Sequence, residues 1–191
     1  MRGVILYGPP AAGKDTVTTA LHDLDNRYQL YARLKVGPGR TSGYRISDES
    51  ALEALRRSGD VVWENQRYGA RYVVDRPSLV TSLSAGVPVV HLGQRQAVAA
   101  VAAAVAGACW YVVYLWCARE LAEQRIIARR TGDTDARLRA WDATEPLPEA
   151  DLTINTGDLS PREAAERIHR HVLAEDAADV PQVRRSSASS P

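Results

Sequence analysis

Short runs of apolar, β-branched and aromatic residues alternate along the chain with longer stretches that have helical periodicity. The expected strands are Gly3 to Tyr7, Tyr28 to Val36, Val87 to Leu92, Trp110 to Cys117 and Leu152 to Asn155. The expected helices are Lys14 to Leu24, Asp48 to Ser58, Pro77 to Ala85, Arg95 to Ala106, Arg119 to Arg130, Asp135 to Thr144 and Pro161 to Ala174. Because strands separated by helices need crossover connections, this order predicts an α/β fold with a mainly parallel central sheet and helices on both faces.

One apolar stretch is long enough to span a bilayer. Ala97 to Ala118 contains 22 residues without a charge, and about 20 apolar residues suffice for a transmembrane helix. Its first half is mostly alanine and ends at Gly107, whereas its second half is aromatic and β-branched. We therefore expect a helix followed by a buried strand, and no association with a membrane.

The overall composition is typical of a compact protein from a reducing compartment. With 191 residues and a formal net charge of +1, the chain is long enough for one α/β domain and gives no electrostatic reason to bind nucleic acid or a membrane surface. Cys109 and Cys117, on one strand, would lie about 26 Å apart, beyond disulfide reach. Met1-Arg2 leads directly into the first strand, leaving no room for a signal peptide. We expect a cytoplasmic protein with one domain over residues 1–175 and a disordered, Ser- and Pro-rich tail over residues 176–191.

A glycine-bounded loop with the sequence GPPAAGKDT directly follows the first expected strand. The spacing G-x-x-x-x-G-K is typical of loops whose backbone N–H groups and following helix N-terminus bind phosphates. The expected contacts here are Gly8, Pro10, Ala11, Ala12, Gly13, Lys14, Asp15 and Thr16. Asp15 stands where Ser or Thr usually binds Mg²⁺, and the first hydroxyl is that of Thr16, so we expect Asp15 or Thr16 to hold a metal ion or its water. An ordinary turn with a chance lysine is the alternative.

Two polar segments are candidates for binding a second ligand. The segment from Lys35 to Arg45 is Gly-rich and follows a strand, a position where ligands bind in parallel sheets. Its cations suit an anionic ligand, although a solvated basic loop would have the same composition. The segment from Trp63 to Tyr72, with Asp75 shortly after it, combines carboxylate, amide, guanidinium and phenol groups suited to a base or sugar. An exposed polar hairpin would look similar.

Arginines cluster around a Gly-Asp-Thr-Asp turn in the third quarter of the chain. The members of this cluster are Arg125, Arg129, Arg130, Arg137 and Arg139. Mobile arginines that close over a transferred phosphoryl group stabilise its charge and exclude water. The cluster therefore predicts a lid, with a salt-bridged pair of helices as the alternative.

In the order and spacing of these segments, the chain resembles the guanylate kinase family of P-loop kinases. The segments that carry the resemblance are GPPAAGKDT, KVGPGRTSGYRIS, WENQRYGARY, RRTGDTDARL and TINTGDL, and it extends from Met1 to about Ala174. It implies a P-loop kinase fold with an acceptor-binding insertion over about residues 35–76 and an arginine-rich lid over about residues 129–139. It also implies ATP and Mg²⁺ as cofactors and a small phosphorylated acceptor, with a nucleoside monophosphate as the first expectation.

The resemblance also implies roles for individual residues. Lys14, Arg130 and Arg137 would be catalytic, and Arg129 and Asn155 would contact the nucleotide. The acceptor would be bound by Lys35, Arg40, Tyr44, Glu64, Tyr68, Arg71, Asp75 and Arg95. If the acceptor nucleophile is a hydroxyl, Glu64 or Asp75 would be the base.

Two departures from the guanylate kinase pattern leave the acceptor open. His91-Leu92-Gly93-Gln94-Arg95 stands where an Asp would end the strand, and the basic segment is shortened. The G-K-D-T loop with a later Gly-x-Arg is more similar to the ribose 1,5-bisphosphate phosphokinase branch. A sugar phosphate or a nucleoside-like molecule is therefore an alternative acceptor. A non-catalytic nucleotide-binding module is another alternative, although the phosphate loop of such modules is expected to have degenerated.

Overall fold

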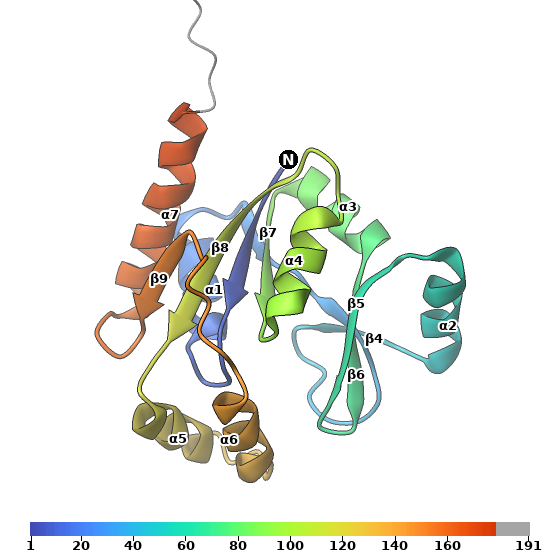
Figure 1. Cartoon of the computed structure of the whole chain (residues 1–191), viewed down its shortest axis with the longest axis horizontal. Coiled ribbons are helices and arrows are strands. Elements are labelled where there is room, and N and C mark those ends of the chain that lie inside the picture. The colour runs from blue at the N-terminus through green and yellow to red at the C-terminus, as the bar shows by residue number, and fades with distance from the viewer. Residues whose placement is uncertain (179–191) are drawn as a thin grey trace, which may run out of the picture.

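The computed structural model describes residues 1–178, which form a central sheet, a smaller second sheet and flanking helices (Figure 1). The central sheet has the strand order β2-β7-β1-β8-β9, and its strands all pair in parallel. These strands are β1 (Arg2–Tyr7), β2 (Tyr28–Leu30), β7 (Val87–Leu92), β8 (Cys109–Trp116) and β9 (Leu152–Asn155). The predicted parallel α/β architecture is confirmed.

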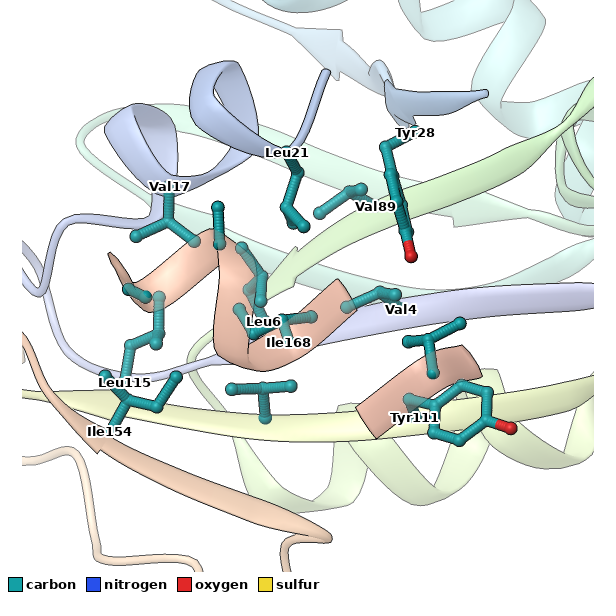
Figure 2. Close-up of a cluster of buried hydrophobic side chains, with 14 of the residues drawn as sticks. Val4, Leu6, Val17, Leu21, Tyr28, Val89, Tyr111, Leu115, Ile154 and Ile168 are labelled. Atoms are coloured by element: carbon teal, nitrogen blue, oxygen red, sulfur yellow. The ribbon is translucent and has the colours of Figure 1, made fainter. Parts of the chain in front are cut away.

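Both faces of the central sheet are buried because successive residues of β1 point to opposite sides. On one face, Val4 and Leu6 pack with residues of α1 (Lys14–Leu24) and α7 (Pro161–Ala178), as Figure 2 shows. On the other face, Ile5 and Tyr7 pack with residues of α3 (Arg76–Ala85) and α4 (Arg95–Ala103). This double coverage explains why β1 is a continuous apolar run rather than an alternating one.

A second sheet occupies the segment, about residues 35–76, for which an acceptor-binding insertion is predicted. Its strand order is β4-β3-β6-β5, and its strands are β3 (Arg33–Val36), β4 (Tyr44–Ser47), β5 (Val61–Arg67) and β6 (Ala70–Asp75). The helix α2 (Glu49–Ser58) covers it by packing the fully buried Leu52 against Leu34 and Val73. The prediction of one strand over Tyr28 to Val36 is wrong, because the chain leaves the central sheet after β2 and enters the second sheet at β3.

The remaining predicted elements are present; α1, β7 and β9 have the predicted ends, and the others are shifted at one or both ends. The segment over about residues 129–139 that is predicted to form a lid runs from the end of α5 (Arg119–Ala128) into α6 (Thr134–Asp142). The uncharged stretch forms the end of α4 and then β8, and no helix within residues 1–178 is both long and apolar enough to cross a membrane. Helix α7 continues to Ala178, so the tail prediction is wrong for residues 176–178, and residues 179–191 lie outside the described residues. Cys109 and Cys117 are both free thiols.

Candidate functional site

The phosphate loop connects β1 to α1 through backbone conformations that favour glycine. Gly8 has a φ of 151° and Gly13 a φ of 85°. A Cβ atom on Gly8 would lie 2.1 Å from the backbone oxygen of Leu115, so a side chain at this position would collide with β8. Helix α1 begins at Lys14 directly after the loop, which places its N-terminus, with unpaired N–H groups, at the loop mouth.

Lys14 is held inside this loop by backbone oxygens. Its ammonium donates hydrogen bonds to the carbonyl of Gly8 at 2.6 Å and to that of Pro9 at 2.8 Å. Burial and, to a smaller extent, the positive charges of Arg33, Arg129 and Arg67 lower the pKa of Lys14 to about 7, against the opposing effect of Asp15. An anion placed at the loop would favour the charged form of this lysine.

A cleft of about 230 Å³ opens in front of the loop. Besides the phosphate loop, its walls come from the second sheet, the segment between β3 and β4, the end of β7, and the α5–α6 region. Among residues 1–178, the cations that line it are Lys14, Arg33, Arg40, Arg67, Arg129 and Arg137. The carboxylates that line it are those of Asp15 and Asp133. The excess of positive charge suits a ligand, or two ligands, with several negative charges.

The wall formed by the second sheet combines aromatic rings with guanidinium groups. The rings of Tyr44 and Tyr72 lie 5.3 Å apart, and the guanidinium of Arg33 lies 5.8 Å from the first ring and 5.2 Å from the second. Asn65 is in register with Tyr72 across the β5–β6 pair and also lines the cleft. This wall offers phenol, guanidinium and carboxamide groups to a ligand.

Asp15 connects the phosphate loop to the basic segment and to the end of β7. Its carboxylate accepts a hydrogen bond from Arg40 at 3.2 Å, and its other oxygen lies 3.5 Å from Nδ1 of His91. Burial, together with the charge of Lys14, lowers the pKa of His91 to about 3, so the imidazole is neutral. Nε2 of His91 and the Thr18 hydroxyl share a hydrogen bond of 2.7 Å.

Two arginines of the predicted lid lie at the cleft. Arg129 and Arg137 both line it. The Nε atom of Arg137 donates to Asp133 at 2.7 Å, and its guanidinium lies 5.2 Å from the centre of the Tyr68 ring. Figure 1 shows α5 and α6 side by side beyond the ends of the central strands. Arg130 is exposed, with a φ of 50°, and is not among the residues that line the cleft.

Seven of the eight residues predicted from the phosphate loop, and five of the twelve other candidates, meet at this cleft. Those that line it are Gly8, Pro10, Ala11, Ala12, Gly13, Lys14, Asp15, Arg40, Tyr44, Tyr68, Arg129 and Arg137. The predicted residues that do not line it are Thr16, Lys35, Glu64, Arg71, Asp75, Arg95, Arg130 and Asn155.

Lys35 and Asp75 do not face the cleft because the fold uses them internally. Lys35 is fully buried, and its ammonium donates to the carbonyls of Pro38 and Arg40 at 2.6 and 2.8 Å. Asp75 is buried, accepts the N–H of Ser78 at the start of α3, and pairs with Arg45.

The other predicted residues outside the cleft have local partners. Glu64 pairs with Arg56, and Arg71 pairs with Glu49. Arg95 and Asn155 bond to Glu149 and Asp158, each at 2.7 Å. The hydroxyl of Thr16 donates to the carbonyl of Gly13 at 2.8 Å, one turn from the loop.

Several residues at the cleft were not in the predicted set. Those with polar side chains are Arg33, Asn65, Arg67, Tyr72, His91, Gln94, Asp133 and Thr144. The alternation along β5 could have indicated two of them, because Asn65 and Arg67 lie two residues apart and share a face. Arg125, away from the lining, donates to the carbonyl of Ala11 at 3.2 Å and to that of Thr156 at 2.8 Å. It thereby joins the phosphate loop to the segment after β9.

The fold is similar to that of solved P-loop kinases. It matches a guanylate kinase from Anaplasma phagocytophilum with a TM-score of 0.57 at 14% identity, over 91% of this chain and 85% of that chain. It also matches a sugar kinase from Janibacter sp. HTCC2649 with a TM-score of 0.55 at 15% identity, over 94% of this chain and 99% of that chain. No protein-family model and no curated sequence matches the chain. The predicted P-loop kinase fold is therefore confirmed.

Proposed function

We propose that the protein is a kinase that transfers the γ-phosphoryl group of ATP to a small phosphorylated acceptor. The observation that carries this proposal is the group of cations from four parts of the fold around the cleft at the phosphate loop. A transferred phosphoryl group spreads charge over its oxygens, and catalysis depends mainly on positioning and on stabilising that charge. A non-catalytic nucleotide-binding module would need the phosphate loop but not Arg129 and Arg137 on the facing wall.

The donor side of the cleft fits the phosphates of ATP with Mg²⁺. The loop N–H groups and Lys14 would hold the phosphates, and Arg129 would contact them from the lid side. Asp15, which lines the cleft, or the neighbouring Thr16 would supply an oxygen ligand to Mg²⁺, which usually takes one or two carboxylates together with substrate phosphates and water. When bound, the metal would neutralise charge on the phosphates. Asn155, at the end of β9, would contact the nucleotide base, as the resemblance to guanylate kinases implies.

The acceptor side is formed by the second sheet. Arg33, Arg40 and Arg67 would bind the acceptor phosphate, and bidentate guanidinium–phosphate contacts would orient it. A nucleoside monophosphate is the first candidate acceptor. A sugar phosphate is the second, because neither Glu64 nor Asp75 reaches the cleft to pair with a guanine edge.

The reacting groups need little proton transfer if the nucleophile is a phosphate oxygen. Such an oxygen is already ionised near neutral pH, so the protein has to align it with the γ-phosphorus of ATP. Arg137, which the Asp133 carboxylate holds at the opposite wall, would stabilise the charge that develops during transfer. Closure of α5 and α6 would exclude water, which would otherwise accept the phosphoryl group.

A screen by phosphorus NMR tests the proposal. The purified protein is incubated with ATP and Mg²⁺ alone, and then with GMP, other nucleoside monophosphates, free nucleosides or sugar phosphates. We expect ADP and a new phosphorylated product with one class of acceptor. If no acceptor raises the rate of ATP conversion above the rate measured with ATP and Mg²⁺ alone, the kinase assignment is refuted.

A further inference from the structure

One buried polar atom at the cleft has no partner within the protein. Among residues 1–178, the buried side-chain nitrogen and oxygen atoms without a hydrogen bond are Nε1 of Trp63, Trp110 and Trp141, and Oδ1 of Asn65. Of these four residues, only Asn65 lines the cleft. A buried acceptor that is left unsatisfied destabilises the folded state, so its presence at a binding surface calls for a ligand.

The position of Asn65 on β5 directs it toward the acceptor side. Asn65 is in register with Tyr72, whose ring lies beside that of Tyr44. Arg67, two residues further along the strand, lines the same cleft. Gln66, between them, is exposed, because alternate residues of a strand face opposite sides.

The charged groups near Asn65 suit the phosphate of an acceptor, so the carboxamide of Asn65 is available to bind the uncharged part. The guanidinium groups of this wall suit a phosphate. Both carboxylates of the cleft are already engaged, Asp15 by Arg40 and Asp133 by Arg137. A neutral hydrogen-bond donor on the acceptor therefore finds a carboxamide or phenol oxygen here, and no free carboxylate.

We propose that Asn65 is a specificity-determining residue that binds an uncharged hydrogen-bond donor of the phosphorylated acceptor. The proposal rests on the proposed function, because it needs an acceptor in this part of the cleft. The terminal torsion of an asparagine side chain is soft, so a small rotation can turn the buried oxygen toward a ligand that enters the cleft beside it. The donor is a sugar hydroxyl or a base N–H, and the experiment distinguishes these two sources.

Calorimetric titration of Asn65→Leu tests the proposal without requiring turnover. The probes are ribose 5-phosphate, GMP and inorganic phosphate, each added in the presence of Mg²⁺ and a non-hydrolysable ATP analogue. We expect the variant to bind ribose 5-phosphate or GMP, whichever the wild type binds, at least tenfold more weakly. Its affinities for inorganic phosphate and for the ATP analogue should be unchanged.

Stability separates a binding role from a structural one. Leu has the same number of side-chain heavy atoms and the same branch point as Asn, and it removes the unsatisfied oxygen, so Asn65→Leu should melt at the same temperature as the wild type or higher. Gln66→Leu, on the exposed side of the same strand, is the matched control and should leave the affinities for all probes unchanged. A variant that melts lower and binds every probe as the wild type does would show Asn65 to be structural.

Asn65→Asp supplies a second, independent test. A carboxylate accepts from two neighbouring N–H groups, as on the edge of guanine, so this variant should shift the affinity ratio toward GMP over ribose 5-phosphate. An unchanged ratio, or a wild type that binds neither compound, would overturn the proposal. Binding that depends on Asn65 without any phosphoryl transfer would refute the kinase assignment and leave the role of Asn65 intact.

Discussion

Replacing Lys14 with Met should raise the stability of the protein while abolishing phosphoryl transfer. The Lys14 ammonium is held in the phosphate loop by two carbonyls, and burial lowers its pKa from 10.5 to about 7. The unfolded chain keeps the proton up to pH 10.5, whereas the folded protein releases it near pH 7. Unfolding therefore takes up a proton between these values, and the free energy of unfolding that depends on Lys14 rises with pH across this interval.

The size of the effect follows from the pKa values. A fall from 10.5 to about 7 corresponds to a cost of about 5 kcal/mol for the charged side chain at pH 7 or below, at about 1.4 kcal/mol per pKa unit. Water in the cleft reduces this cost, because Lys14 is only partly buried, and Met loses two hydrogen bonds of about 1 kcal/mol each. The free energy of unfolding of Lys14→Met should therefore exceed that of the wild type by about 2 kcal/mol. This corresponds to a rise of about 4–8 °C in melting temperature for a chain of this length.

Thermal melts of wild type and Lys14→Met between pH 6.5 and 10 provide the assay. We expect the variant to melt higher at pH 7, and the difference to shrink toward pH 10 as Lys14 of the wild type loses its proton. Activity should fall at least a hundredfold, because the charge that contacts the phosphates during transfer is lost. A variant that melts lower at pH 7, or a difference independent of pH, would refute the argument that Lys14 is held at a cost to stability.

Three further substitutions test separate parts of the site. Arg137→Ala should lower kcat at least tenfold with little change in KM, whereas Arg139→Ala, exposed on the same helix, should change neither; equal rates for both variants would exclude a catalytic lid. Asp15→Asn should raise the Mg²⁺ concentration needed for half-maximal rate more than the KM for ATP, with a stability loss of about 1 kcal/mol or less because its pair with Arg40 is exposed. Equal changes in the Mg²⁺ titration and the ATP titration would exclude a role of Asp15 in metal binding. Gly8→Ala should destabilise the fold by about 2–4 kcal/mol in denaturant titrations, because its Cβ would collide with Leu115. Gly132→Ala is the control, because its Cβ would meet no atom within 4 Å. Equal losses of stability in the two variants would show that the backbone moves to avoid the collision with Leu115.

The central sheet could be predicted from the sequence because each strand carries its own signal. Strand β7 and helix α1 have the predicted ends, since apolar runs and turn residues mark them locally. The change of sheet between Leu30 and Arg33 has no such signal. Tyr31 and Leu34 are both buried, so the apolar run continues across two strands that belong to different sheets.

The candidate site also has one part that local sequence predicts and another part that it does not. The phosphate loop was predicted residue by residue because its contacts arise within one short segment. The wall of the second sheet depends on which side of β5 faces the cleft, and a one-residue shift exchanges every side chain between the two sides. The charge of Glu64 makes it the predicted acceptor-binding residue on this strand, but Asn65 is the residue that lines the cleft.

Lys35 shows why charge alone misleads in a glycine-rich segment. A cation beside Gly37 and Gly39 suggests an anion site, yet the segment folds back so that the carbonyls of Pro38 and Arg40 satisfy the buried ammonium. A buried cation with such partners fixes the path of the backbone around it. The adjacent Arg40 then extends to Asp15 at the cleft. Lys35 and Arg40 are both predicted to bind the acceptor, but Lys35 holds the loop in shape and only Arg40 reaches the cleft.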